Sequence, residues 1–230
     1  MISDGFGGED ADMISQSETP LALLGPARLI PLVTIERVED AAPLARTLVN
    51  AGLHMMEIAL RTKAAPQAIR AIAREAPDAV IAVGNIMTPH DLALARECGA
   101  RLALSPGATD ALLDAAAAQD MPFVPGVATA SELMRVLSKG FHVVKFFPAV
   151  ALGGAEALRA MGSAFPHVRF CPAGGTSEAE YEQWLALPNV IAVGGSWLAP
   201  PEEIAARDWA MIGKRAQLAV AKFIARRTTA

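Results

Sequence analysis

The chain contains little of what marks several large classes of protein. Only 5% of its 230 residues are aromatic, and its hydrophobic residues, 53% of the total, never form an unbroken run of the about 18 that a membrane span needs. Its two cysteines, Cys98 and Cys171, fit neither a metal-binding pair nor a redox motif. The sequence therefore predicts no transmembrane helix and no disulfide framework, and both cysteines are expected to be small buried side chains.

Charge and motifs exclude further classes. The formal net charge is −4, and no basic stripe of the kind that binds nucleic acid is present. No H-E-x-x-H or other cluster of metal ligands occurs, and no G-x-G-x-x-G follows the first apolar block, so neither a metal nor another cofactor is predicted. The N-terminus lacks a basic segment followed by an apolar stretch, and we expect a cytoplasmic protein.

What the sequence does contain is a recurring apolar block. Short apolar blocks, bounded by Gly, Pro or charged residues, begin roughly 20–27 residues apart, the length of one strand, one helix and two short loops. Blocks of this kind are typical of strands buried in a parallel sheet. The predicted strands are 29–35, 55–60, 80–85, 101–106, 122–127, 143–148, 168–173 and 190–195.

Eight strand–helix units, with no sequence left for a second domain, predict an α/β fold: a single-domain (β/α)8 TIM barrel with a short N-terminal extension. We assign residues 1–25 to the extension, with a flexible tail over 1–12 and a short lead-in helix over 13–25, and residues 26–230 to the barrel. The stretch 201–227 is predicted to be one helix. A doubly wound open sheet is the alternative, but it usually has fewer strands.

Two charged residues interrupt the apolar strands, and Lys145 is the first. Because side chains alternate across a strand, Lys145 shares a face with Val143 and Phe147. Burial penalises an unpaired ammonium, and a neutral lysine amine is a nucleophile towards carbonyl groups. The alternative interpretation is that Lys145 belongs to a buried ion pair.

Glu57, in the predicted strand 55–60, is the second charged residue that interrupts an apolar strand. A carboxylate in an apolar pocket suits a general base, and the alternative is a salt bridge with Arg61 or Lys145. Glu57 and Arg61 have the same parity, so their side chains should point the same way, about 13 Å apart along the strand. An arginine at a barrel mouth suits a substrate carboxylate or phosphate, and the alternative is a solvated loop residue.

Two Gly-Gly turns follow the last two predicted strands: Gly174 and Gly175 after the seventh, then Gly194 and Gly195, with Ser196, after the eighth. Barrels often bind phosphate at these loops through backbone N–H groups, where a side chain would block the anion. Together with the amine, the carboxylate and the arginine, these loops indicate a metal-free retro-aldol reaction. The amine would form a Schiff base with a ketone, and the carboxylate would take the proton of a hydroxyl group.

A protein of a different class would keep the phosphate loops without this chemistry. It would be a phosphate-binding barrel isomerase or a non-catalytic sugar-phosphate binder, with Lys145 and Glu57 as a structural ion pair. Phosphosugar binding without the trapping of pyruvate on Lys145 would favour this alternative.

Six motifs stand in order along the chain. They are Glu57-Ile58-Ala59-Leu60-Arg61-Thr62, Ser105-Pro106-Gly107, Val124-Pro125-Gly126-Val127, Lys145-Phe146-Phe147-Pro148-Ala149, Arg169-Phe170-Cys171-Pro172-Ala173-Gly174-Gly175 and Gly194-Gly195-Ser196-Trp197-Leu198. As an ordered set they resemble the 2-keto-3-deoxy-6-phosphogluconate (KDPG) / 4-hydroxy-2-oxoglutarate (KHG) aldolase family. The resemblance covers about residues 25–215.

The resemblance implies a class I lyase that cleaves KDPG to pyruvate and glyceraldehyde 3-phosphate in the Entner–Doudoroff pathway, typically as a homotrimer. It implies Lys145 as the Schiff-base lysine, Glu57 as the general acid/base and Arg61 as the residue near the pyruvate carboxylate. It further implies that Pro106 and Phe147 form pocket walls. The implied phosphate cradle consists of Gly174, Gly175, Gly194, Gly195 and Ser196.

The chain departs from the family pattern on the substrate side. The third-strand motif, usually Gly-Thr-Val, is Gly84-Asn85-Ile86, in which Asn85 is still able to donate to a carboxylate. These departures leave KDPG, its galactonate epimer, KHG and related 2-keto-3-deoxy acids open as substrates. The other departures are Ala59 and Ala173 in place of threonine, Val150 in place of glutamate, and Thr176 in place of an apolar residue.

Overall fold

The structure, a computed structural model, describes residues 19–119 and 121–229, in which strands alternate with helices. The predicted tail 1–12 and the first part of the predicted lead-in helix lie outside the described residues. The strands are β1 Leu29–Val33, β2 Met55–Ala59, β3 Val80–Gly84, β4 Leu102–Leu104, β5 Phe123–Val124, β6 Gly126–Val127, β7 Val143–Phe146, β8 Arg169–Pro172 and β9 Val193–Gly195. The helices are α1 Pro20–Ala27, α2 Val38–Asn50, α3 Ala65–Glu75, α4 Pro89–Glu97, α5 Asp110–Ala118, α6 Ala130–Ser138, α7 Gly154–Ala164, α8 Tyr181–Leu185, the 3-10 turn η1 Ser196–Leu198, α9 Pro201–Ala206 and α10 Trp209–Thr229.

Each predicted strand interval contains an observed strand, and the differences lie mainly at strand ends. The interval 122–127 holds two short strands, β5 and β6, because Pro125 between them has no N–H to donate to a neighbouring strand. The interval 190–195 is a strand only from Val193, and Val190 forms an isolated parallel bridge with Phe170 of β8.

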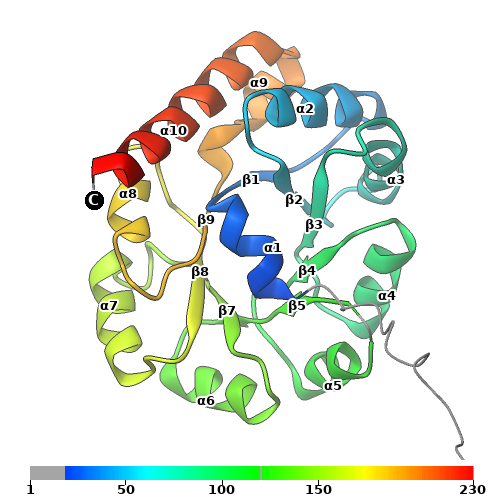
Figure 1. Cartoon of the computed structure of the whole chain (residues 1–230). Coiled ribbons are helices and arrows are strands. Elements are labelled where there is room, and N and C mark those ends of the chain that lie inside the picture. The colour runs from blue at the N-terminus through cyan, green and yellow to red at the C-terminus, as the bar shows by residue number, and fades with distance from the viewer. Residues whose placement is uncertain (1–18, 120, 230) are drawn as a thin grey trace, which may run out of the picture.

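The strands form a curled parallel sheet. Their pairing order is β5-β4-β3-β2-β1-β9 in one part and β6-β7-β8 in the other, and the two parts follow one another in the chain through β5 and β6. Figure 1 shows the strands in the middle of the molecule with the helices around them. Among the described residues, β8 and β9 share no strand pairing, and Phe170 of β8 forms only an isolated bridge with Val190, three residues before β9.

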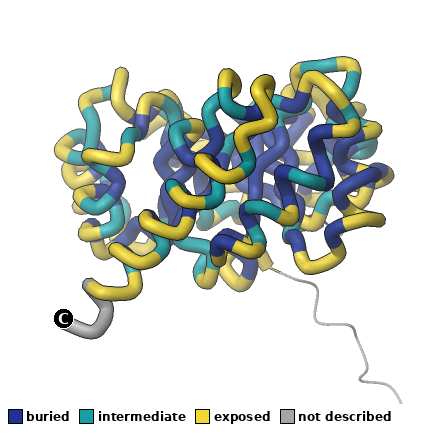
Figure 2. The backbone as a smooth tube through the Cα atoms, turned by 90° about the horizontal axis from the view of Figure 1, so that it is seen from above, coloured by how far each residue is buried: buried dark blue, intermediate teal, exposed yellow. Residues whose placement is uncertain are grey.

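Side-chain alternation gives the sheet two apolar surfaces. On β2, Met56 and Ile58 belong to the layer between the sheet and the helices, whereas Met55 belongs to a separate inner cluster. Leu23 and Leu24 of α1 complete that inner cluster, and Figure 1 shows α1 lying across the middle of the strands. Figure 2 shows the resulting pattern, with buried backbone at the centre and exposed backbone on the outer helices. Helix α1 therefore closes the interior at one end of the sheet.

Two predicted helices differ from the structure. The lead-in helix is observed as α1, Pro20–Ala27, with Thr19 as its N-cap, so it continues past residue 25. The prediction of one helix over 201–227 is wrong, because Arg207 takes a left-handed φ of 56° after α9. The Asp208 carboxylate then accepts a hydrogen bond of 3.0 Å from the N–H of Met211, which caps the start of α10.

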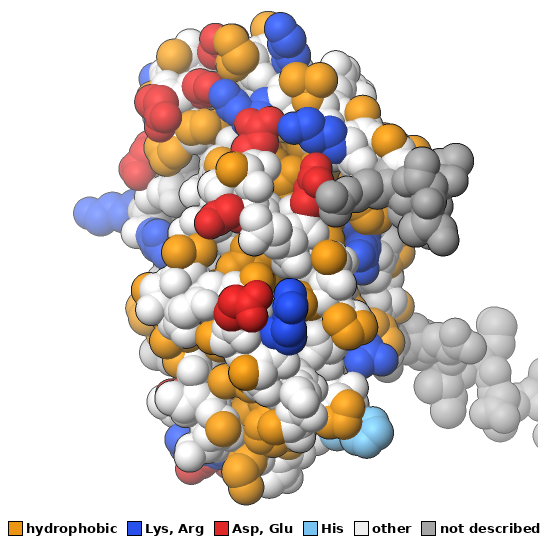
Figure 3. Space-filling view, turned by 90° about the vertical axis from the view of Figure 1, so that its left-hand side faces the viewer, with side chains coloured by type: hydrophobic (Ala, Val, Ile, Leu, Met, Phe, Trp, Pro, Cys, Tyr) orange, Lys and Arg blue, Asp and Glu red, His pale blue; other side chains and the backbone are white. Residues whose placement is uncertain are grey.

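The outer surface agrees with the modest net charge. On the face drawn in Figure 3, acidic and basic side chains are intermixed, so this face carries no stripe of a single sign. Within the described ranges, none of the helices has both the length and the apolar character that crossing a bilayer demands.

Candidate active site

Lys145 lies on β7 with its side chain on the inner side of the curled sheet. Its neighbours Val144 and Phe146 point the other way, into the layer between sheet and helices. Lys145 itself is only 4% exposed, and its Nζ donates a hydrogen bond of 2.6 Å to Glu57 Oε1. Strand parity therefore placed the amine correctly, and the buried ion pair that we considered as an alternative is present.

Glu57 reaches the amine from β2 on another part of the sheet. It is also 4% exposed, and Gly84 of the adjacent β3 lies against it. A Cβ atom at Gly84 would overlap the Glu57 carboxylate, so a glycine is needed there to make room for the acid. Because the two charges are buried together, removing one partner alone typically costs about 3–5 kcal/mol.

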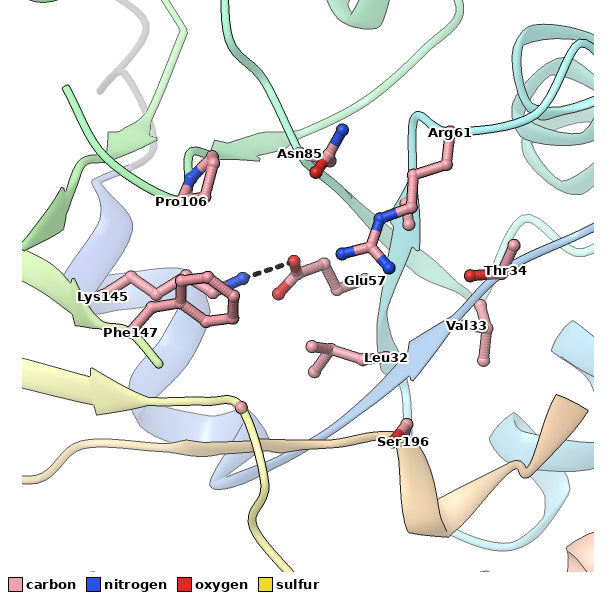
Figure 4. A pocket seen from close by; sticks show the side chains of 12 residues that line it. Leu32, Val33, Thr34, Glu57, Arg61, Asn85, Pro106, Lys145, Phe147 and Ser196 are labelled. Atoms are coloured by element: carbon pink, nitrogen blue, oxygen red, sulfur yellow. Dashed lines mark hydrogen bonds and ion pairs between the residues drawn. The ribbon is translucent and has the colours of Figure 1, made fainter. Parts of the chain in front are cut away.

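The pair borders a cavity of about 210 Å³ at the carboxyl ends of the strands (Figure 4). Residues from β1, β2 and β7, and from the loops that follow β1, β2, β3, β4, β7 and β8, contribute to its wall, together with the first residue of η1. The predicted residues Gly175, Gly194 and Gly195 are not part of this wall. The lining residues are Leu32, Val33, Thr34, Glu57, Ala59, Arg61, Asn85, Pro106, Lys145, Phe147, Gly174 and Ser196.

Arg61 follows the strand and lines the cavity, as the sequence predicted, although the strand ends one residue earlier than the predicted interval 55–60. Strand β2 ends at Ala59, and Arg61 lies in the turn that follows, where its N–H donates to the Ala59 carbonyl at 2.8 Å. Figure 4 shows its guanidinium group extending over the cavity towards Glu57. Of the two salt bridges considered as alternatives for Glu57, the one with Lys145 is formed and the one with Arg61 is not. Arg61 has no ion-pair partner in the part of the chain that the structure describes. Its charge is available to an anion in the cavity.

Asn85 follows β3 directly and has a left-handed φ of 63°. Asparagine tolerates this conformation better than a β-branched residue does. Figure 4 shows the Asn85 carboxamide at the cavity, on the same side as Arg61. The predicted strand 80–85 is therefore one residue too long, and the backbone turn at its end is what presents the amide to the site.

The first Gly-Gly turn needs glycine for both space and backbone conformation. Gly174 and Gly175 have φ values of 94° and 83°. A Cβ at Gly174 would lie 3.0 Å from the Phe147 ring, and one at Gly175 would lie 2.9 Å from the Cβ of Val150. Across 19–119 and 121–229, no backbone carbonyl accepts a hydrogen bond from the N–H of Gly174 or of Gly175. These two N–H groups are therefore free to bind an anion.

The predicted second turn begins later than expected: Gly194 and Gly195 are the last residues of β9, paired with Ile30 and Pro31 of β1, and the chain turns only at Ser196. The second Gly-Gly turn is therefore this strand end together with Ser196, and it is crowded rather than strained. A Cβ at Gly194 would lie 2.6 Å from Leu32 Cδ1, and one at Gly195 would overlap the Trp197 indole nitrogen. Gly194 and Gly195 are buried, whereas Ser196, which starts η1, is exposed and lines the cavity. Of this turn, Ser196 is thus the residue that meets the cavity directly.

Sequence reasoning missed Thr34. It follows β1 and lines the cavity with Leu32 and Val33, and Figure 4 shows its hydroxyl on the side of Arg61. A polar residue at the end of an otherwise apolar predicted strand was the signal available for it. Thr34 adds a hydroxyl group to the arginine and the amide on this side of the site.

Cys171 shares the buried surroundings of the Lys145 amine. It is paired with Lys145 in the register between β7 and β8, and it belongs to the inner apolar cluster. Burial raises the pKa of its thiol to about 12. The described residues hold no cluster of three or more His, Cys, Asp or Glu side chains that could bind a metal ion.

The fold and the site together define a class of protein: an α/β enzyme with a buried amine, a carboxylate and an unpaired guanidinium group around one cavity. Sequence relatives identify the family. A model of the family described as KDPG and KHG aldolase matches residues 22–215. The KHG/KDPG aldolase of Escherichia coli (strain K12) is 44% identical over 199 residues, which cover 86% of this chain and 93% of the relative. The 2-dehydro-3-deoxy-phosphogluconate aldolase of Pseudomonas aeruginosa is 40% identical over 197 residues, which cover 86% of this chain and 90% of the relative.

Solved structures support the same family assignment. The KDPG aldolase of Legionella pneumophila, with pyruvate captured as a covalent carbinolamine intermediate, has a TM-score of 0.86 and 41% identity, covering 88% of this chain and 98% of that chain. The KDPG aldolase of Zymomonas mobilis with 3-phosphoglycerate has a TM-score of 0.82 and 39% identity, covering 86% of this chain and 93% of that chain. The chain belongs to the KDPG and KHG aldolase family, whose members are lyases.

Proposed function

We propose that this chain is a class I aldolase that cleaves KDPG to pyruvate and glyceraldehyde 3-phosphate. The observation that carries the proposal is the buried hydrogen bond of 2.6 Å between Lys145 Nζ and Glu57 Oε1 beside the cavity. The names of the relatives, and the pyruvate captured covalently in the Legionella pneumophila structure, support it.

The ion pair is the resting state of this chemistry. When the Lys145 ammonium gives a proton to Glu57, the neutral amine attacks C2 of the keto acid and forms a carbinolamine. Glu57 returns the proton to the C2 hydroxyl, which leaves as water, and a protonated imine results. The Glu57 carboxylate next takes the proton of the C4 hydroxyl.

Cleavage then follows without a metal. The C3–C4 bond breaks, its electron pair moves into the imine, and glyceraldehyde 3-phosphate leaves as the aldehyde. Glu57 protonates C3 of the enamine, and a water molecule hydrolyses the imine, which releases pyruvate and restores Lys145. One water is lost and one is gained, so substrate and products balance.

The proposed substrate spans the cavity between two groups of donors. Arg61, Asn85 and Thr34 lie on one side and are suited to the carboxylate. The N–H groups of Gly174 and Gly175, with Ser196 and the end of β9 at Gly194 and Gly195, are suited to the phosphate. Pro106 and Phe147 form walls beside the amine. The phosphoglycerate in the Zymomonas mobilis structure supports the binding of a phosphorylated three-carbon unit.

We also propose how the sheet closes and how the chain is organised. We infer that the curled sheet closes as an eight-stranded (β/α)8 barrel over residues 26–230, with 1–25 as an extension. The consecutive strands β5 and β6 and the Phe170–Val190 bridge support closure, since they connect the two parts of the sheet. We also propose that the enzyme is a cytoplasmic homotrimer that needs no cofactor.

A pyruvate-release assay over a panel of 2-keto-3-deoxy acids tests the function. We expect KDPG to be cleaved fastest, the galactonate epimer and KHG more slowly, and activity to survive EDTA. Preferred cleavage of KHG or of the epimer would move the assignment to that substrate. Phosphosugar binding without any pyruvate release would instead favour the isomerase or the non-catalytic binder.

A further inference from the structure

The two Gly-Gly turns lie on opposite sides of the least paired part of the sheet. Gly174 and Gly175 follow β8, and Gly194 and Gly195 end β9. Two backbone hydrogen bonds at the Phe170–Val190 bridge connect the chain there, from Phe170 N–H to the Asn189 carbonyl and from Ile191 N–H to the Phe170 carbonyl. In the described part of the chain, no strand pairing continues from this bridge to the turns. Each turn is instead held by its other neighbour, Gly194 and Gly195 by β1 and Gly174 by the N–H of Val150. Among the described residues, no backbone hydrogen bond joins the two turns to each other.

A side chain supplies the missing connection. Thr176 directly follows Gly175, is 7% exposed, and donates a hydrogen bond of 2.6 Å from its Oγ1 to the Gly194 carbonyl. The same oxygen is 3.2 Å from the position that a Cβ at Gly195 would take, so it lies against both glycines of the second turn. An apolar side chain at this position could not make this bond.

We propose that Thr176 is a positioning residue that holds the two Gly-Gly turns in the arrangement needed to bind the substrate phosphate. The proposal rests on the proposed aldolase function. Thr176 does not line the cavity and touches no reacting group, whereas Gly174 of the first turn and Ser196 of the second do line it. A cradle whose donors come from two separate turns binds an anion well only if the turns are fixed relative to one another.

The physical expectation is a defect in binding rather than in chemistry. Lys145 and Glu57 lie on β7 and β2, and their contact does not involve either Gly-Gly turn. Loss of the Thr176 bond should therefore weaken phosphate binding, raise KM and leave kcat nearly unchanged. An unphosphorylated substrate does not use the cradle, so its kinetic constants should be unaffected.

The experiment compares Thr176→Val with Thr176→Ser on KDPG and on 2-keto-3-deoxygluconate, which lacks the phosphate. Valine keeps the shape of threonine without the hydroxyl group, and serine keeps the hydroxyl group. For Thr176→Val we expect KM for KDPG to rise about three- to tenfold, the range expected for one hydrogen bond, with kcat within twofold of wild type. Thr176→Ser should restore KM to near its wild-type value.

Ser177→Ala is the matched control, because the Ser177 hydroxyl bonds to Glu180 at 2.9 Å and not to the second turn. It should leave KM for KDPG unchanged. A wild-type KM in Thr176→Val, or an equal rise for both substrates, would overturn the positioning role. Failure of the wild-type chain to release pyruvate would instead overturn the proposed function, so the two failures are distinguishable.

Discussion

The two ends of the sheet interior are built from the same strands but differ in chemistry. On β2 the inward residues are Met55 and then Glu57, and on β7 they are Val143 and then Lys145. The first inward residue of each strand thus belongs to an apolar layer that α1 closes. The next inward residue, two positions further along the strand, is charged and faces the cavity. Cys171, level with Lys145 in the strand register, and Lys145 itself are both buried, so burial extends up to the amine.

This difference shows how the fold separates stability from chemistry. The apolar end excludes water from below the ion pair, so the amine and the carboxylate meet solvent only through the cavity. In such surroundings the two charges interact strongly with one another and with a bound substrate. Changes at the charged end should therefore affect turnover as well as stability, whereas changes at the apolar end should affect unfolding and leave turnover nearly unchanged.

Removal of the amine should have the largest effect. Lys145→Met fills the same space without a nucleophile, and we expect pyruvate release from KDPG to fall by roughly 10⁴-fold or more. Purified protein with an intact circular dichroism spectrum is the control for folding. A variant that keeps more than a tenth of the wild-type rate would show that Lys145 does not carry the reaction.

Removal of the base should have the next largest effect. Glu57→Gln keeps the shape that the space beside Gly84 accommodates, but an amide does not take up the C4 proton. We expect kcat for KDPG cleavage to fall by about 10²–10⁴-fold. The result would contradict the role of Glu57 if kcat stayed within threefold of wild type in steady-state assays.

The apolar end should respond in stability instead. Leu24 of α1 is fully buried, and Leu24→Ala should lower the free energy of unfolding by about 2–5 kcal/mol in urea titrations. Leu21→Ala, on the exposed side of the same helix, is the control and should cost less than about 0.5 kcal/mol. If Leu24→Ala lowered kcat as strongly as Glu57→Gln, the claim that the apolar end contributes to stability and not to turnover would be contradicted.

An ion pair outside the sheet should contribute least. Arg215 of α10 donates to both oxygens of Glu203 of α9, and this hydrogen bonding holds the pKa of Glu203 below its usual value. Because the folded pKa is lowered, the stabilisation exists above the unfolded carboxyl pKa and is lost as the pH falls through the folded one. We expect Glu203→Gln to cost about 0.5–1 kcal/mol at pH 7 in urea titrations.

The control for this pair is the same titration at a pH below the folded pKa of Glu203. There the wild-type carboxyl is protonated, and the difference between the two proteins should be close to zero. A difference that stayed constant with pH would show that the charge of Glu203 is not its source.

Much of the fold could be predicted because its signals are local. Apolar blocks at regular spacing indicated the strands, and the alternation of side chains placed Lys145 and Glu57 on the inner face. The interruptions within strands and helices were harder to predict. The interruption at Pro125 and the left-handed turn at Arg207 each depend on one residue inside an otherwise continuous pattern.

The site could be predicted only where a residue was anomalous in its own strand. Sequence spacing does not give the contact between Lys145 and Glu57, since the two lie 88 residues apart and meet only in the curled sheet. Thr34 was missed because one threonine near a strand end is common. The bond from Thr176 to Gly194 joins two turns whose closeness only the folded chain reveals.

The most direct test of the account is reductive trapping of the amine. The protein is incubated with pyruvate and sodium borohydride, digested, and analysed by tandem mass spectrometry. We predict that one reduced pyruvate is bound to Lys145 in the wild-type chain and that none is bound in Lys145→Met. An unmodified Lys145, or a pyruvate adduct found only on an exposed lysine such as Lys214, would contradict the claim that the buried amine is the nucleophile.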